Sequence, residues 1–454
     1  MGTTYLNRTP SSAGNRRTWT WSSWVKLHSV GSNNTTDNNI LLNARQDDGN
    51  LEILQFNGST GTFMYANFTG AVAISAFNTN AVYRDFSGWY HVVLEVDTTQ
   101  ATDSNRIKLY INGVQETSLV ATYGGYPIYP PQNTQGWINN TVNHEIGAYN
   151  TTARLNATLA HTHLTDGTAY NASAFGQTDA TSGIWKPILS PSVTYGTNGF
   201  FLKFANSASL GTDSSGNGNN FTVNGSGTQT LDTPSNVFAT FNSLSKGIDG
   251  TLSKGNLSID YGGALTRTGQ PATLGVSQGK WYWEVKASAS SSADNYTIGI
   301  VGTQYNNSAT ASYSIGYYPG YTGQGYGYLS FDGSVLKNDS AVVTLNSYTT
   351  GDIIGIALDL DNNDLYFYKN GTIQNGGTAI DISSVTPDYG VWFPAVGDGA
   401  STNTCTFDAN FGNGYFGTTA VATPESDSAG IGKFEYSVPS GYYALCTKNI
   451  ATYG

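Results

Sequence analysis

The chain has 454 residues, of which only 11% are charged, and its formal net charge at neutral pH is −11. This sign excludes nucleic acid as a partner, because phosphate binding requires a basic face. The length exceeds that of one hydrophobic core, and the 54 glycines and 30 tyrosines, with few strong helix formers, predict an all-β protein of several domains.

Targeting signals and metal motifs are absent from the sequence. There is no apolar signal core at the start and no apolar run long enough for a bilayer, so we expect neither visible export nor membrane insertion. Cys405 and Cys446 are the only cysteines; two buried thiols are the simpler interpretation, and a bridge between them stays open. The five histidines form no H-E-x-x-H pattern, so no metal site is predicted.

The first strands are predicted from alternation. Residues 18–26 (TWTWSSWVK) alternate large and small side chains, as a half-buried strand does, and residues 40–44 and 51–56 predict two more. The most diagnostic pair is residues 89–97 (WYHVVLEVD) and 106–114 (RIKLYINGV). This pair resembles strands of laminin-G or concanavalin A-like jelly rolls. The resemblance implies an antiparallel β-sandwich and allows calcium on its edge loops, although turn chemistry explains the local acidic residues.

A long loop follows these strands. Residues 122–137 contain YGGYPIYPPQ, and the prolines exclude an ordinary central strand. Long loops on rigid sandwiches are commonly functional, and flat amphipathic rings stack on sugars or peptide groups. The aromatic residues of this loop are therefore predicted to bind a ligand: Tyr123, Tyr126, Tyr129 and Trp137. Residues 169–178 predict one short helical turn, and residues 199–204 the last strand of a first domain at 1–206.

Residues 207–245 are rich in Gly, Asn and Ser and predict a connector. Three long phrases, RTPSSAGNRRTWTWSSWVK, YGTNGFFLKFANSASLGTDSSGNGNNFT and LDTPSNVFATFNSLS, resemble segments of marine, cyanophage-like bacteriophage structural proteins. Those proteins pair a laminin-G-like domain with a SPRY domain. The resemblance implies a virion component that is made in the host cytoplasm without a signal peptide. Its implied partners are other virion proteins and further copies of itself, with trimers usual among phage fibres.

Residues 351–373 (GDIIGIALDLDNNDLYFYKNGTI) predict a hairpin. Its first strand, 353–360, is nearly all apolar, and its second closes on Asn370-Gly371, a pair suited to the positive φ of a tight turn. With GKWYWEV upstream and FDANFG downstream, this stretch resembles the core of a SPRY domain. The resemblance implies a second β-sandwich at 246–423. Residues 424–454 then form a C-terminal appendage, apolar enough to pack on a domain or on a neighbour.

Ligands of SPRY domains are held by loops at one end of the sandwich, as the resemblance implies. The corresponding stretch, residues 313–328, interleaves tyrosine with glycine. One interpretation is a wall of the sandwich, to which we assign Tyr313 and Tyr328; the other is a set of exposed binding rings. The second set is predicted to comprise Tyr317, Tyr318, Tyr321 and Tyr326.

Catalysis has little support in the sequence. Glu95 and Asp97 are the nearest approach to the paired carboxylates of a glycosidase, but a second Glu is missing from their strand. No nucleophile elbow or phosphate loop occurs, His91 is interpreted as a packed strand residue, and His161 and His163 lack a third metal ligand.

We therefore expect a protein that is not an enzyme and has no cofactor: two tandem antiparallel β-sandwich (jelly-roll) domains with a short C-terminal appendage. Its expected role is a tail-fibre or spike component that binds host-surface glycan or protein through sandwich-end loops. The alternatives are a capsid decoration or head-fibre protein, and a glycan-cleaving depolymerase.

Overall fold

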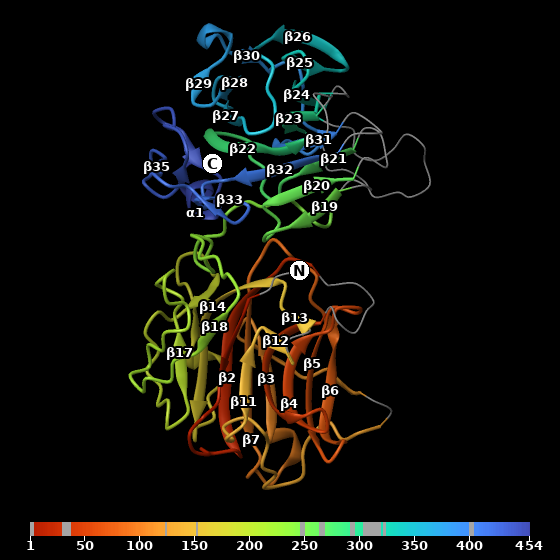
Figure 1. Cartoon of the computed structure of the whole chain (residues 1–454), viewed down its shortest axis with the longest axis vertical. Coiled ribbons are helices and arrows are strands. Elements are labelled where there is room, and N and C mark those ends of the chain that lie inside the picture. Colours follow the sequence, from red (N-terminus) through yellow and green to blue (C-terminus); the bar gives the residue numbers. More distant parts are fainter. Residues whose placement is uncertain are drawn as a thin grey trace. The chain divides into compact units, whose positions relative to one another are not determined.

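The computed structural model describes residues 4–29, 38–122, 125–150, 153–245, 250–262, 268–290, 296–302, 319–320, 324–398 and 404–454. The chain divides into two compact units, Met1–Gln229 (unit 1) and Thr230–Gly454 (unit 2). Figure 1 shows that both are built from β-strands, so the all-β, two-sandwich prediction is confirmed. The division falls inside the stretch predicted as a connector.

The described part of unit 1 is built on two large antiparallel sheets. Sheet A has the order β10-β6-β5-β4-β3-β11-β1-β18 and sheet B the order β17-β14-β2-β7-β8-β9. Sheet A contains β1 Tyr5–Arg8, β3 Asn39–Asp47, β4 Asn50–Phe56, β5 Thr62–Thr69, β6 Val72–Val82, β10 Leu119–Ala121, β11 Asn143–Ile146 and β18 Thr222–Asn224. Sheet B contains β2 Thr18–Leu27, β7 Tyr90–Asp97, β8 Ile107–Ile111, β9 Val114–Glu116, β14 Ala157–Asp166 and β17 Phe200–Leu202. Shorter elements are β12 Ala148–Tyr149, β13 Ala153–Arg154, β15 Gly176–Thr178, β16 Trp185–Pro187 and the 3₁₀ turns η1 Asp103–Asn105 and η2 Ala172–Ala174.

Strand β2 shows why the alternation in the sequence is informative. Successive side chains of a strand point to opposite faces. Trp19 and Trp21 lie in the core between the sheets with no exposed surface, whereas Trp24 faces outward and stacks on His91 of β7, with ring centroids 4.7 Å apart. Both faces of β2 are therefore buried, because residues of the 168–195 segment also pack on the outer face of sheet B.

The predicted connector is largely structured as part of unit 1. Strand β18 pairs with β1, which places both ends of unit 1 side by side in sheet A. Asp213 accepts hydrogen bonds from the backbone of Phe201, Ser215 and Asn219 at 2.8–2.9 Å. Short polar side chains of this kind bond to nearby backbone in turns. The Gly/Asn/Ser-rich composition therefore encodes a folded loop and an edge strand here, and residues 207–229 complete unit 1.

The described part of unit 2 is also built on two large sheets. Sheet C has the order β19-β20-β32-β22-β27-β28-β29, with β30 on β28 and β37 on β22, and sheet D the order β21-β31-β23-β24-β25-β26. Sheet C contains β19 Gly250–Ser253, β20 Ser258–Tyr261, β22 Lys280–Ser290, β27 Ile353–Asp359, β28 Asp364–Lys369, β29 Thr372–Ile373, β30 Ile380–Asp381, β32 Cys405–Asn410 and β37 Tyr443–Ala444. Sheet D contains β21 Thr268–Pro271, β23 Tyr296–Val301, β24 Gly325–Leu329, β25 Ser334–Lys337, β26 Ser340–Thr344 and β31 Phe393–Asp398. Shorter elements are β33 Tyr415–Phe416, β34 Thr419–Ala420, β35 Glu425–Ser426, β36 Lys433–Phe434, η3 Asn375–Gly377 and α1 Thr447–Tyr453.

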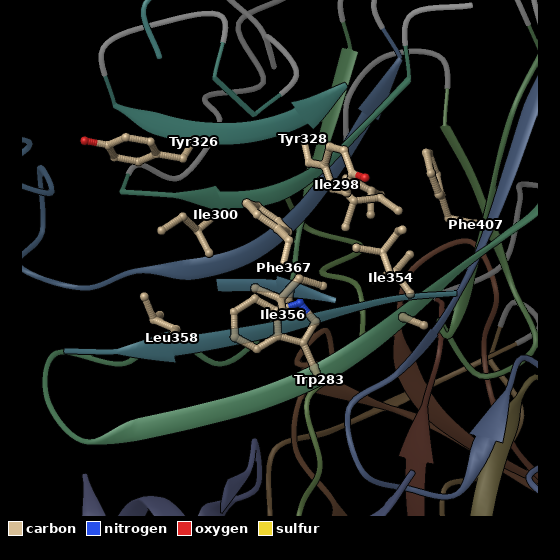
Figure 2. Close-up of a cluster of buried hydrophobic side chains, with 14 of the residues drawn as sticks. Trp283, Ile298, Ile300, Tyr326, Tyr328, Ile354, Ile356, Leu358, Phe367 and Phe407 are labelled. Carbon is tan, nitrogen blue, oxygen red and sulfur yellow. The ribbon is translucent and has the colours of Figure 1, made fainter. Parts of the chain in front are cut away.

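The core of unit 2 lies between its two sheets. Figure 2 shows Trp283 from β22 and Ile354 and Ile356 from β27 facing Ile298 and Tyr328 of sheet D. All seven residues of β27 are buried, as expected for a strand covered on both faces. Its outer face is covered by the C-terminal segment (residues 424–454), since Ala357 packs in one cluster with Phe434, Tyr442 and Ala444. The predicted appendage therefore packs on unit 2.

The two units close corresponding hairpins in the same way. In β7–β8 the backbone N–H of Asn112 donates to His91 O (2.8 Å), and Asn112 Oδ1 accepts from His91 N (2.7 Å). In β27–β28, Asn370 makes the same two bonds to Ile353, both at 2.8 Å. Both asparagines have φ near 50° and precede a glycine of positive φ. The side-chain amide thus extends the sheet ladder by one bond at each Asn-Gly corner, which explains why the two predicted hairpins share a sequence pattern.

Candidate binding site

The structure places the predicted binding tyrosines of unit 2 as follows. Tyr317, Tyr318 and Tyr321 lie outside the described residues, as does Tyr313. Tyr326 was predicted to be an exposed ring, and this is wrong: it lies in β24, only 1% exposed, with its hydroxyl against Ser384 and Asp381 O. Gly325-Tyr326-Gly327-Tyr328 is a strand, so both tyrosines point to the same face and enter the core, as Figure 2 shows. The assignment of Tyr328 to the sandwich wall is confirmed.

The predicted loop of unit 1 is held firmly against sheet A. Tyr123 lies outside the described residues, whereas Tyr126, Tyr129 and Trp137 are half-buried. Ala76 N donates to Pro127 O (2.9 Å) and Ser75 Oγ to Ile128 O (2.5 Å), so the loop first continues along the edge of β6. Tyr129 and Trp137 then pack against the core between the sheets, and Tyr126 packs against the outer face of sheet A. Among the predicted rings, Tyr126 is therefore placed on that outer face.

A buried carboxylate fixes the far end of this loop. Glu52 of β4 is 1% exposed and accepts hydrogen bonds from Trp137 N (2.7 Å), Ile138 N (2.9 Å) and Tyr65 Oη (2.6 Å). Burial raises the pKa of Glu52, while these donors and the charge of Arg16 act in the opposite direction. The Trp137 indole N–H donates to Phe68 O (2.7 Å), and the Arg16 guanidinium lies 5.7 Å from the Trp137 ring. The Trp137 side chain is therefore oriented by Phe68 O and Arg16, and its backbone is held by Glu52.

We expect Glu52→Ala to destabilise unit 1 by about 2–4 kcal/mol, because it leaves buried N–H groups without an acceptor. Glu52→Gln should cost less, because one carboxamide oxygen still accepts. Urea unfolding followed by tryptophan fluorescence measures both, and Asp103→Ala, at an exposed position of η1, serves as the control. Equal midpoints for Glu52→Ala and the control would show that Glu52 does not hold the loop.

The outer face of sheet A combines an apolar floor with half-exposed aromatic residues. Ladder pairing places Asn43, Ile53, Ala66 and Ala76 opposite one another on this face of β3–β6. The floor is buried, and the half-buried side chains packed on it, here called the aromatic rim, are Phe68, Tyr126 and Tyr149. The sequence did not indicate Tyr149, because only the hairpin β12–β13, which lies against β3, carries it onto this face.

Tyr149 is fixed by charged neighbours. Its hydroxyl donates to Asp48 Oδ1 (2.8 Å), Arg45 lies over its ring at 5.5 Å, and Arg45 pairs with Asp48 at 2.8 Å. The pKa of Asp48 is lowered, first by the Tyr149 hydroxyl and then by Arg45. Burial raises the pKa of Tyr149 to about 12, so its hydroxyl stays protonated and able to donate.

A row of amides continues this face beyond β3. Asn224 Nδ2 donates to Asn7 Oδ1 (2.8 Å), and Asn7 Nδ2 donates to Asn143 Oδ1 (3.3 Å). These three side chains, here called the amide row, are half-exposed on β18, β1 and β11. Aromatic rings beside planar amides suit a ligand with flat apolar faces and hydroxyl groups at its edges, such as a saccharide.

The candidate catalytic groups are engaged elsewhere. Glu95 accepts from Tyr110 Oη (3.0 Å) and Lys108 Nζ (3.4 Å), and Asp97 accepts from Thr99 and Gln100 in its own turn. Both carboxylates therefore have structural partners, which leaves the paired arrangement of a glycosidase without support.

The tautomer of His91 decides whether its contact with Ser22 could activate the serine. Ser22 Oγ lies 2.9 Å from His91 Nε2, and the Trp185 indole N–H donates to His91 Nδ1 at 2.9 Å. Since Nδ1 accepts, the proton of the neutral ring is on Nε2, which donates to Ser22 and so cannot take its proton. Burial also lowers the pKa of His91 to about 3. The contact is a packed polar pair, in agreement with the interpretation of His91 as a strand residue.

The other histidine, acidic and cysteine side chains considered as candidate sites also lie in structural positions. His163 Nδ1 lies 2.9 Å from Tyr195 Oη, and within the described ranges no three His, Cys, Asp or Glu side chains could together hold a metal ion. In the 359–364 turn Asp359 pairs with Lys280 at 2.6 Å. Cys405 and Cys446 are both buried. No helix in the described part of the chain is long and apolar enough to span a membrane.

Two family models match the chain. Residues 1–155 match the concanavalin A-like lectin/glucanases superfamily, and residues 280–414 match the SPRY domain. A Drosophila melanogaster protein described as a Ran-binding proteins 9/10 homolog is 30% identical over 129 residues, which cover 26% of this chain and 12% of that protein. The chain thus spans about an eighth of the length of this relative.

Solved structures were also found to be similar. The SPRY domain of human HERC1 is 17% identical with a TM-score of 0.29, covering 37% of this chain and 96% of that one. Stonustoxin is 17% identical with a TM-score of 0.29, covering 38% of this chain and 27% of that one. The TRIM65 PSpry domain is 17% identical with a TM-score of 0.28, covering 38% and 89%.

Proposed function

We propose that this chain, a concanavalin A-like domain followed by a SPRY domain, is a non-enzymatic structural and binding component of a bacteriophage virion. In this proposal it belongs to a tail fibre or spike and binds a host-surface glycan through the outer face of sheet A. The observation that carries the glycan assignment is the aromatic rim beside the amide row, on one face of one sheet. The virion assignment is supported by the three long phrases that resemble phage structural proteins.

Unit 2 has a different part in this proposal. The Drosophila relative that matches 129 residues of this chain is described as Ran-binding, so a module of this kind serves a protein that binds another protein. We assign unit 2 to contact with another virion protein or with further copies of the chain. The absence of a role in hydrolysis is supported by the engaged carboxylates of Glu95 and Asp97 and by the tautomer of His91.

Loss of the rim rings tests the glycan assignment. Tyr126→Ala and Tyr149→Ala should each weaken binding to a glycan array prepared from host surface polysaccharide, by about 2–12-fold for loss of a stacking ring. Tyr389→Ala is the matched control, because Tyr389 is 66% exposed in unit 2. If all three variants bind like the parent, the outer face of sheet A is not the glycan site.

Position in the virion tests the rest of the proposal. Antibody labelling of purified particles should mark the tail tip or its fibres. Labelling spread over the head would instead favour a capsid decoration protein. Release of reducing sugar ends from host polysaccharide by the pure chain would overturn the non-enzymatic assignment.

A further inference from the structure

Arg154 is a cation of unit 1 that lacks an acidic partner among the described residues. It ends the β12–β13 hairpin and is half-buried, with its guanidinium 4.4 Å from the centre of the Tyr5 ring. Its Nη1 atom is buried without a hydrogen-bond partner. By contrast, Arg45 on the same face is paired with Asp48. Because Nη1 itself is covered, a ligand can reach this cation only through the exposed part of the half-buried side chain. The described part of the chain gives the charge of Arg154 no acidic partner.

The surroundings of Arg154 follow from the ladder. Tyr5 pairs with Asn224 across β1 and β18, and Asn7 is two residues along the same strand, so all three side chains share the outer face of sheet A. The Tyr5 ring under the guanidinium thus stands next to the amide row. The carboxylate of Glu145 lies on this face too, but its Oε2 already accepts from Asn43 Nδ2 (3.2 Å) and Asn150 N (3.0 Å).

We infer that Arg154 selects an anionic ligand, and that the saccharide bound by unit 1 carries an acidic group, a carboxylate or a sulfate, which docks on this guanidinium. The inference rests on the proposed glycan binding and specifies its ligand class. A planar guanidinium stacked on an aromatic ring has its orientation fixed in advance, so less entropy is lost when it forms a bidentate bond to an acid. The amide row supplies donors and acceptors for the sugar hydroxyls beside the acid.

Three probes and three variants test this assignment on the full chain. The probes are an oligogalacturonate, a sulfated dextran oligomer and a neutral maltohexaose, measured by isothermal titration calorimetry. Arg154→Gln should weaken binding to an acidic probe at least about tenfold, because it removes a charge-assisted hydrogen bond. Arg154→Lys should restore part of the loss, because it keeps the charge but not the fork.

Arg84→Gln is the matched control: it removes the same charge from unit 1 at an exposed arginine that donates to Thr60 O. It should leave the affinity for each probe within about twofold. Added salt should weaken acidic binding to the parent and have less effect on Arg154→Gln. Circular dichroism establishes that each variant is folded, and if Arg154→Gln fails to fold, Arg154→Lys alone decides through its intermediate affinity.

The outcomes separate the two proposals. Acidic binding that Arg154→Gln and Arg154→Lys leave unchanged overturns the role of Arg154. Tyr126-dependent binding of maltohexaose with no preference for the acidic probes overturns the inference, while glycan binding itself stands. If none of the three probes binds but the host glycan array is bound with dependence on the rim tyrosines, the acidic ligand class is again wrong and the proposed function is not.

Discussion

Lowering the pH from 7 to 4.5 will destabilise unit 1 and stabilise unit 2. Four histidines of unit 1 are buried, and burial lowers the pKa of His28 to about 4, of His91 to about 3 and of His144 to about 4, and that of His163 well below its usual value. In the unfolded chain these groups take up protons near pH 6.5, so the unfolded state binds more protons below that pH. Their stabilising contribution is fully present above pH 6.5 and is lost as the pH falls.

The expected loss of stability in acid is large for a single unit. His28, His91 and His144 should each remove about 2–3 kcal/mol of stability by pH 4.5, and His163 acts in the same direction, against a typical total of about 5–15 kcal/mol for a domain. Glu52 opposes the effect, because its raised pKa favours the folded state at lower pH, but it is one group against four. Unit 1 should therefore unfold in mild acid, before its carboxylates are protonated.

Unit 2 contains no histidine and should respond in the opposite direction. Glu284 of β22 has no exposed surface, and burial raises its pKa to about 7. Since the folded state then holds a proton that the unfolded state releases above pH 4.5, stability rises as the pH falls from 7 to 4.5. The groups that face Glu284 are Tyr282, Asn410, Glu435 and Tyr436, and Glu435 acts in the same direction as burial.

Hydrogen exchange of the full chain, corrected for the intrinsic pH dependence of exchange, measures both units in one sample. Protection should fall across residues 4–229 and rise across residues 230–454 between pH 7 and pH 5. Glu284→Gln should remove the increase in unit 2. A parallel loss of protection in both units would contradict the opposite signs derived for the buried histidines and Glu284.

Removal of residues 424–454 will leave unit 2 unfolded while unit 1 keeps its structure. The C-terminal segment contributes Phe434, Ala444, Leu445 and Cys446, none of which has exposed surface, and β37 pairs with Trp281 and Tyr282 of β22. It also donates two backbone N–H groups, from Glu435 and Tyr436, to the Glu284 carboxylate at 2.9 and 3.0 Å. A truncated chain would leave that carboxylate and the aromatic face of sheet C without cover.

A point substitution in the C-terminal segment should destabilise unit 2 less than the truncation does, by an amount that can be measured. Phe434→Ala should cost about 3–5 kcal/mol, the usual range for removing a buried aromatic ring. Leu244→Ala, at a residue that is 57% exposed in unit 2, should cost less than about 0.5 kcal/mol. Calorimetry of the full chain separates the two, and a truncated protein with an unchanged unit 2 transition would show that the segment is dispensable.

The fold class could be predicted because its signals are local. Alternation in residues 18–26, the apolar run at 353–360 and the two Asn-Gly corners each involve neighbours in sequence, and the structure has a strand or hairpin at every one of them. The place of residues 207–229 in unit 1 could not be predicted, because a Gly/Asn/Ser-rich composition is shared by free linkers and by loops held through side-chain hydrogen bonds. Only the contacts of Asp213 and the pairing of β18 with β1 distinguish the two.

The candidate binding site, like the fold, was determined partly by local sequence and partly by tertiary structure. The sequence alone determined that this protein is two β-sandwiches with tyrosine-rich segments, because strand periodicity and turn chemistry depend on adjacent residues. The tertiary structure decided which side chains could face a ligand. Tyr326 enters the core, Tyr126 and Tyr149 both pack on the outer face of sheet A, and the Arg154 guanidinium lies over the Tyr5 ring. Those outcomes depend on strand register and on which loop crosses which sheet, and both are set by pairings between residues far apart in the chain.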